Sequence, residues 1–279
     1  MNKEIYFYWG NQPMSYLRYM MLKSFEILNP DWDINLISNQ DIAENKWTSS
    51  EEQDNVNYRG YDYRNEFHKI KTLNHISLDE IFPINYQGMS NVHIKDILNW
   101  YLLSTRSCVV ADMDILFSLP ISKTEEIDWD ADVNLCSYDF FNSYIPVSFM
   151  VSKVDDTGIN PLYEKVYQNS IKVYNKRVYE SCGYNAIPYD NIDHIIDQFK
   201  DLKIHKMESE IVFPFAKINL VHSGKLCWEE GSKFKIDEKT IGIHWYGGQP
   251  ISQKYNNIIT DKNYKEYNNI ITQTINKLI

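Results

Sequence analysis

Two aspartates, one residue apart, directly follow a short apolar run, and no other feature of the chain constrains its fold as much. The run Cys108–Ala111 is uncharged and rich in β-branched residues, which is typical of a strand buried on both faces of a parallel sheet. An unpaired charge is costly to bury, so Asp112 and Asp114 should lie beyond the C-terminal tip of that strand. Open α/β sheets bind their ligands at that edge.

An Asp-x-Asp at such a place has two interpretations. Carboxylate oxygens suit a hard divalent cation, which in turn holds phosphate oxygens. A solvated turn needs no ligand, and it is the commoner explanation for an isolated Asp-x-Asp. The residues around the motif therefore have to decide between the two.

Strand and helix patterns alternate along the chain. Ile5–Trp9 and Asp33–Ile37 predict strands, and an apolar stripe predicts a helix over Ser15–Leu28 between them. A second helix, with Ser90 as its N-cap, should run to about residue 104 and lead into the Asp-x-Asp strand. This alternation predicts an α/β fold, with a mostly parallel central sheet flanked by helices.

The remaining segments are assigned more coarsely. Residues 43–83 are polar and rich in tyrosine, and they predict a helical or irregular insertion that contains a helix over Glu66–His75. No repeat, linker or shift in composition divides the chain, so residues 1–279 should form a single domain. Further strands are expected at 133–136, 147–151 and 241–245, a flexible turn at 246–250, and helices at 161–174, 192–200 and 256–279.

Charge and cysteine usage narrow the class of protein. The formal net charge of -10 repels polyanions, which disfavours a nucleic-acid partner. The four cysteines are far apart and form no C-x-x-C pair, which favours reduced thiols over disulfides or a zinc site. The chain shows neither a signal peptide nor a run of ~18 apolar residues. We therefore expect a cytoplasmic protein with at most peripheral membrane contact.

Several segments in order resemble one family. Asn91–Trp100 followed by Asp112-Met113-Asp114 resembles the core signature of sugar-nucleotide transferases of the GT-A fold. More narrowly, it is similar to glycosyltransferase family 32 and the capsular-polysaccharide sugar transferases, a group that also resembles glucosylating bacterial toxins. Tyr6–Gly10 is similar to the first strand of that family, Asn29–Trp32 to the step before its second strand, and Ile243–Gly248 to its late His-Trp element.

Two departures from the family pattern leave the identity of the donor sugar open. Asn99 stands where the family has an arginine that helps to bind the donor sugar. Thr105-Arg106-Ser107 replaces the Gly-Gly that precedes the Asp-x-Asp strand, and Arg106 is a candidate substitute for the missing cation.

The resemblance implies a Mn²⁺ or Mg²⁺ ion held by Asp112 and Asp114, and a UDP- or GDP-sugar as donor. His244 is a candidate third metal ligand, and the alternative is a histidine that only packs in the core. Asp96 is a candidate acceptor of a hydrogen bond from a sugar hydroxyl, and the alternative is a solvated charge.

Donor binding is expected from aromatic and glycine residues at the same edge. Trp9, supported by Tyr8, is a candidate to stack on the base, and the alternative is that both pack in the core. Trp245 is a candidate donor to the leaving phosphate, Lys254 a further candidate phosphate contact, and the Gly247-Gly248 loop a candidate lid. The expected donor-binding set is Tyr8, Trp9, Gly10, Asp96, Asn99, Asp112, Trp245 and Gly248.

The sequence shows no evident nucleophile. Asp139, after a predicted strand, is a candidate to face the acceptor, so the candidate catalytic residues are Asp96, Asp112, Asp114 and Asp139. The resemblance implies a metal-dependent, retaining hexosyltransferase of polysaccharide biosynthesis that acts on a glycan acceptor. Two alternatives remain open: transfer to a protein by an effector-like enzyme, and a non-catalytic homologue that binds sugar nucleotide or glycan. A DNA-modifying transferase is disfavoured by the acidic charge.

Overall fold

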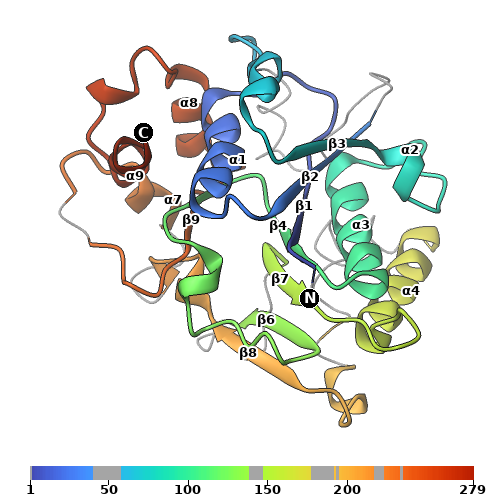
Figure 1. Ribbon diagram of the computed structural model, residues 1–279. Helices are drawn as coiled ribbons and strands as arrows, with labels where there is room; N and C mark the ends of the chain where they lie inside the picture. The colour runs from blue at the N-terminus through green and yellow to red at the C-terminus, as the bar shows by residue number, and fades with distance from the viewer. Residues whose placement is uncertain are drawn as a thin grey trace.

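The computed structural model describes residues 2–39, 58–137, 147–176, 192, 195–216, 223–232 and 235–279. Within them, the core of the molecule is a seven-stranded sheet with strand order β3-β2-β1-β4-β7-β6-β8, beside a two-stranded sheet, β5-β9 (Figure 1). The strands are β1 (Glu4–Tyr8), β2 (Asp33–Ser38), β3 (Leu73–Ser77), β4 (Val109–Ala111), β5 (Ile115–Phe117), β6 (Val133–Ser137), β7 (Phe149–Ser152), β8 (Ile204–Glu208) and β9 (Gly242–His244).

The large sheet is mostly parallel. Strands β3, β2, β1 and β4 run parallel to one another in this order, and β8 is parallel to β6. Only β7 runs against the two strands beside it, β4 and β6. The α/β class expected from the sequence, with a mostly parallel central sheet flanked by helices, is therefore confirmed.

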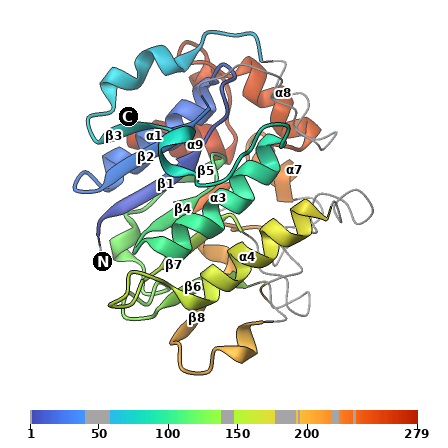
Figure 2. The ribbon, with the colours of Figure 1, turned by 90° about the vertical axis from the view of Figure 1, so that its right-hand side faces the viewer.

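Helices cover both faces of this sheet. Figure 2 shows α3 (Asn91–Thr105) and α4 (Pro161–Asn175) side by side against one face, and α1 (Tyr16–Leu28) lies against the other. Because side chains alternate along a strand, Ile5 and Phe7 of β1 pack on the α1 side. Tyr6 and Tyr8 pack on the α3 side. The other α-helices in the described residues are α2 (Leu78–Ile81), α7 (Ser223–Cys227), α8 (Pro250–Ile258) and α9 (Ile270–Leu278).

Serine side chains cap both helices: the predicted cap Ser90 is confirmed, and Ser15, placed inside the predicted helix, is the N-cap of α1. The hydroxyl of Ser15 accepts the backbone N–H of Arg18, and that of Ser90 accepts the backbone N–H of His93. Each bond satisfies one of the backbone donors that a helix N-terminus leaves without a partner.

The helix predicted over Glu66–His75 is wrong in its second half. A 3-10 helix, η2, spans Tyr63–Lys69, and Leu73–Ser77 forms β3, which pairs in parallel with β2. The backbone bonds gained along β2 decide the conformation here, because β-strand formation depends on its neighbours more than on local pattern. Residues 58–83 thus contribute an edge strand to the sheet rather than a separate cover, while 43–57 lie outside the described residues.

The single helix predicted over 256–279 is also wrong. The segment contains the end of α8, the 3-10 helix η8 (Tyr264–Glu266) and α9. Side-chain amides interrupt it: Asn263 Oδ1 accepts the backbone N–H of Thr260, and Asn269 caps α9 by accepting that of Thr272. Such local bonds compete with helix continuation.

The other differences between the predicted and the observed elements are smaller. Strand β8 and helix α8 were not predicted, and the expected helix over 192–200 is a 3-10 turn over Ile196–Gln198 in its described part. Cys108, Cys136 and Cys227 are buried free thiols, whereas Cys182 lies outside the described residues. Among the described helices, none combines the length and apolar character needed to cross a bilayer.

Asn29 joins the end of α1 to the segment after β5, and its loss should destabilise the fold. Its side chain is buried, donates to the carbonyl of Phe25 and accepts the backbone N–H of Ile121. Asn29→Ala leaves that buried N–H without its partner, so we expect the free energy of unfolding in urea to fall by about 1–3 kcal/mol. Asn276→Ala, on the exposed side of α9, is the matched control and should stay within about 0.5 kcal/mol of wild type.

His93 should make the protein less stable in mild acid. Burial lowers the pKa of His93 from 6.5 to about 4. The unfolded chain therefore takes up a proton first as the pH falls, and stability is lost between about pH 6.5 and 4, by up to about 3 kcal/mol. Urea unfolding of wild type and His93→Gln at pH 7, 6 and 5 measures the effect, and equal slopes for the two proteins would contradict it.

Candidate active site

The site lies where the chain changes direction within the sheet. β1 has β2 on one side and β4 on the other, so the topological switch point lies between the C-terminal ends of β1 and β4 (Figure 1). Open α/β sheets bind ligands at such a point. Trp9 and Gly10 follow β1 directly, and Asp112 follows β4. The Asp-x-Asp therefore has the position that the sequence predicted for it.

Pairing of β5 with β9 brings His244 to the two carboxylates. Ile115 and His244 are opposite each other in this antiparallel pair, and the backbone N–H of Trp245 donates to the carbonyl of Asp114 (3.0 Å). His244 Nε2 lies 3.3 Å from Asp114 Oδ1 and 3.8 Å from Asp112 Oδ2. One ligand atom from each of the three residues lies within 4.8 Å of the others, so the structure brings together the whole expected metal-binding set.

The two aspartates are held by other groups of the protein. Asp114 Oδ2 accepts the backbone N–H of Gly247 (2.7 Å). Asp112 Oδ1 lies 2.6 Å from the ammonium of Lys95, which also lies 3.2 Å from Asp96. Lys95 therefore bridges two carboxylates that come from different elements, α3 and the tip of β4.

Burial and neighbouring charges shift the pKa values of Lys95, Asp96 and Asp112 in opposite directions. Burial raises the pKa of Asp96 to about 6, and Lys95 offsets this rise only in part. Burial would also raise the pKa of Asp112, but the attraction of Lys95 and His244 outweighs it, and the pKa lies below its usual value. The carboxylates in turn hold the pKa of Lys95 above its usual value against the effect of burial. Lys95 is thus a fixed positive charge.

The proton of His244 can be placed from its hydrogen bonds. The backbone N–H of Tyr246 donates to Nδ1 at 3.3 Å, so the ring of a neutral histidine carries its proton on Nε2, facing the aspartates. Binding a metal through Nε2 would displace that proton and give up the bond from Tyr246. Two carboxylates and one imidazole nonetheless form a donor set that suits Mn²⁺ or Mg²⁺.

Lys95 was not among the candidates from the sequence, and Arg106 was the wrong cation. Helix α3 runs antiparallel to β4, so its N-terminal half lies beside the C-terminal tip of the strand. Arg106, after the C-terminus of α3, lies at the opposite end of β4 and over the ring of Tyr6 (5.6 Å). One feature of the sequence points to Lys95: this residue directly precedes Asp96, a candidate site residue on the same helix.

Arg18 is a second cation that sequence reasoning missed. It is 5% exposed, and its guanidinium lies 5.0 Å from the ring centre of Trp9 and 4.6 Å from that of Trp245. A Cβ on Gly247 would lie only 2.2 Å from this guanidinium and 3.2 Å from Asp114 Oδ2. Gly247 therefore permits the close approach of Arg18 to the acidic residues.

Tyr8, the last residue of β1, and Trp9 after it point to opposite faces of the sheet. Trp9 is 3% exposed, has Arg18 over its ring and donates its indole N–H to the carbonyl of Gln12 (3.1 Å). Tyr8 points to the other face of the sheet, where its hydroxyl lies 2.7 Å from Asn91 Oδ1. Tyr8 therefore does not support Trp9 as expected. In this arrangement Trp9 packs in the core, so stacking on a base would require Arg18 to move or the other ring face to be used.

Buried amides without partners gather near the end of β1. Within the described part of the chain, both amide atoms of Gln12 and the amide nitrogen of Asn91 have no hydrogen-bond partner, and neither does the amide nitrogen of Asn99 two turns further along α3. A Cβ on Gly10 would lie 2.5 Å from Gln12 and 2.9 Å from the amide nitrogen of Asn91. Buried polar groups normally find partners, so these amides favour a polar ligand here.

The remaining candidates are placed as follows. Trp245 is fully buried against Arg18, and the carbonyl of Gly248 accepts the side chain of Gln253 (3.0 Å). Lys254 is exposed, with its ammonium 5.9 Å from the ring centre of Tyr255. Asp139 lies outside the described residues, so its expected role stays a prediction.

Comparisons with known proteins give similar solved structures only. No family model and no curated protein matches the sequence. All of this chain matches 87% of the PaToxG glycosyltransferase at 12% identity (TM-score 0.49), and 60% of apo glycosyltransferase GlyE of Streptococcus pneumoniae TIGR4 at 13% identity (TM-score 0.47). Galactosyltransferase LgtC, in complex with donor and acceptor sugar analogues, matches over 92% of this chain and 84% of its own at 16% identity (TM-score 0.38). At these values the likeness carries no argument about function, which has to rest on the site itself.

Removing the bridging cation should destabilise the protein. Lys95→Met leaves the buried Asp96 and the partly buried Asp112 without their shared positive charge, so the free energy of unfolding in urea should fall by about 3 kcal/mol. Adding Asp96→Asn should recover part of this loss, since one buried carboxylate is then gone. Lys172→Met, at an exposed position of α4, is the control. Equal stability of the single and double variants would show that the bridge is not the cause.

Proposed function

We propose that this protein is a metal-dependent glycosyltransferase that takes a hexose from a UDP- or GDP-sugar and passes it to a glycan acceptor. The observation that carries the proposal is the convergence of Asp112, Asp114 and His244 at the switch point of a mostly parallel sheet. Carboxylates at that edge are typical of sites that bind phosphorylated ligands through a metal ion.

The metal would be held by these three residues, and the imidazole favours Mn²⁺. When bound, such an ion neutralises the charge that develops on the diphosphate as the glycosidic bond breaks. Lys95 orients Asp112 through Oδ1, and Gly247 orients Asp114 through Oδ2. Because both carboxylates are fixed before a ligand arrives, little reorganisation is needed.

Other residues at this edge support donor binding. Arg18 adds a buried positive charge beside Gly247 and Asp114, close to where a diphosphate would meet the metal. The unpartnered amides of Gln12 and Asn91 provide donors and an acceptor for the polar edge of a base or for ribose hydroxyls. Asp96, tied to Lys95, acts as a positioning residue in this proposal.

The glycan acceptor, retention of configuration and a role in polysaccharide biosynthesis rest on the resemblance of the sequence motifs. A cytoplasmic location and the lack of a nucleic-acid partner likewise stay predictions. Retention of configuration does not by itself identify a nucleophile. Asp96 does not fit that role, because it is 3% exposed and already bound to Lys95.

Donor hydrolysis tests the proposal. Wild type, incubated with a panel of UDP- and GDP-sugars and Mn²⁺, should release the nucleotide from one donor and should stop when EDTA is added. Asp114→Asn should bind Mn²⁺ more weakly by calorimetry and lower the rate by about 100-fold or more, because one ligand charge is lost. Asp201→Asn, at an exposed position before β8, is the matched control and should behave as wild type.

Two results would argue against this function. Full metal-dependent cleavage by Asp114→Asn would show that Asp114 is not a metal ligand. Binding of a nucleotide sugar without cleavage of any donor, by a folded protein with Mn²⁺ present, would instead indicate a non-catalytic homologue.

A further inference from the structure

A cavity of about 420 Å³ lies apart from the acidic site, between α1, η2 and the turn after α8. Its lining consists of Tyr16, Tyr19, Tyr61, Tyr63, Glu66, Lys69, Thr260, Asp261 and Lys262. None of these residues belongs to the acidic cluster of Asp112, Asp114 and His244. Its volume falls in the range of small-molecule sites.

The regular geometry of two helices builds the cavity walls. In a 3-10 helix, residues three apart share one face, so Tyr63, Glu66 and Lys69 of η2 all line the cavity. On α1, Tyr16 and Tyr19 lie on the side that faces η2. Arg18 lies on another side of the same helix, toward Trp9 and Trp245.

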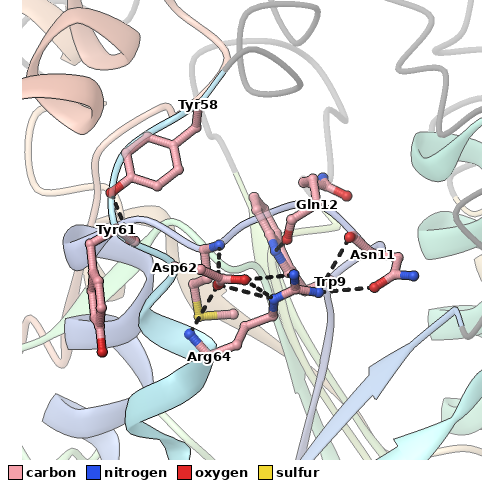
Figure 3. Close-up of polar contacts among 8 residues, drawn as sticks. Trp9, Asn11, Gln12, Tyr58, Tyr61, Asp62 and Arg64 are labelled. Atoms are coloured by element: carbon pink, nitrogen blue, oxygen red, sulfur yellow. Dashed lines mark hydrogen bonds and ion pairs between the residues drawn. The ribbon is translucent and has the colours of Figure 1, made fainter.

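The η2 wall is fixed in place by polar contacts (Figure 3). Arg64 forms a two-pronged ion pair with Asp62 (2.6 and 2.9 Å), and its other nitrogen donates to the side chain of Asn11 (2.9 Å). Asp62 also accepts the backbone N–H of Met14 (3.0 Å). These bonds attach η2 to the loop between β1 and α1, so the wall is part of the folded structure.

Four tyrosine rings form the apolar surface of the cavity. Ring centres lie 5.4 Å apart for Tyr16 and Tyr63, 5.9 Å for Tyr19 and Tyr63, and 5.0 Å for Tyr61 and Tyr63. Tyr61 is 53% exposed, so much of its ring faces solvent. The cluster therefore offers aromatic faces to a ligand at its open side.

Two tyrosine hydroxyls on the cavity wall provide polar groups for a ligand. Tyr16 and Tyr19 are 3% and 8% exposed as whole residues and line the cavity, and in the described ranges no protein group bonds to either hydroxyl. Tyr63 and Tyr61, by contrast, donate to Asp261 and Glu66. Burial raises the pKa of Tyr19 to about 12, so its hydroxyl stays neutral and can both donate and accept.

The charges of the lining favour a neutral ligand. Glu66 and Asp261 carry two negative charges, and Lys69 and Lys262 carry two positive ones. A cation would meet the two ammonium groups, and an anion would meet the two carboxylates. A neutral molecule rich in hydroxyls avoids both penalties and uses both kinds of charged group as hydrogen-bond partners.

We propose that this tyrosine-lined cavity is a second saccharide site, which binds a neutral pyranose unit of a glycan away from the acidic cluster. The C–H faces of the sugar pack on Tyr61 and Tyr63, and its hydroxyls bond to Tyr16, Tyr19 and the charged rim. The proposal does not depend on transferase activity, because binding requires neither a donor nor a metal.

Saccharide binding by NMR tests the proposal. Saturation-transfer difference spectra of the full chain with neutral mono- and disaccharides (glucose, galactose, mannose, N-acetylglucosamine, maltose and lactose), without metal or nucleotide, should show binding at millimolar affinity. Tyr61→Ala should weaken it about tenfold, and Tyr19→Phe, which removes only a hydroxyl, severalfold. Tyr101→Phe, on the opposite face of the sheet, is the control and should leave it unchanged.

Asp114→Asn separates this site from the acidic site. We expect this variant to bind the saccharide as wild type does, even where nucleotide-sugar cleavage is lost. No binding by any sugar of the panel, binding that Asp114→Asn abolishes, or binding that Tyr61→Ala and Tyr19→Phe leave intact would each overturn the proposal. Tyr61→Ala changes a half-exposed residue, and its urea unfolding curve verifies that it folds.

Discussion

Partly buried carboxylates at the tip of β4 have to be neutralised where they lie, and the arrangement of the site follows from this constraint. Asp96 is 3% exposed, and Asp112 and Asp114 are largely shielded from solvent. A charge in such a place is stable only with close partners. Lys95, His244 and the backbone N–H of Gly247 supply them from three separate segments. The same fixed oxygens are what a metal ion requires.

Helix direction and strand pairing place those partners. Because α3 runs antiparallel to β4, its first turns lie beside the carboxylates, whereas Arg106 lies at the far end. The pairing of β5 with β9 joins residues about 130 positions apart in the chain and sets His244 opposite Ile115. Neither the direction of α3 nor the pairing of β5 with β9 follows from a strong local conformational preference. Both result from tertiary packing.

Helix α1 contributes to both proposed sites. Successive residues of an α-helix are rotated by about 100°, so Arg18 can face Trp9 and Trp245 while Tyr16 and Tyr19 face η2. One helix thus separates a charged site at the sheet edge from a charge-balanced, aromatic cavity. The two sites differ in chemistry because the lining of one centres on carboxylates and that of the other on tyrosine rings and hydroxyls.

The α/β class, the start of α3 at its Ser90 cap, and the position of Asp112 and Asp114 after β4 could all be predicted from the sequence alone. Each of these depends on short-range features: apolar periodicity, capping side chains and the cost of burying charge. Contacts between distant segments make Leu73–Ser77 a strand, turn Tyr8 away from Trp9, and bring Lys95 to Asp112 and Arg18 to Trp9. These features depend on which segments lie beside one another, and spacing along a single chain does not encode that directly.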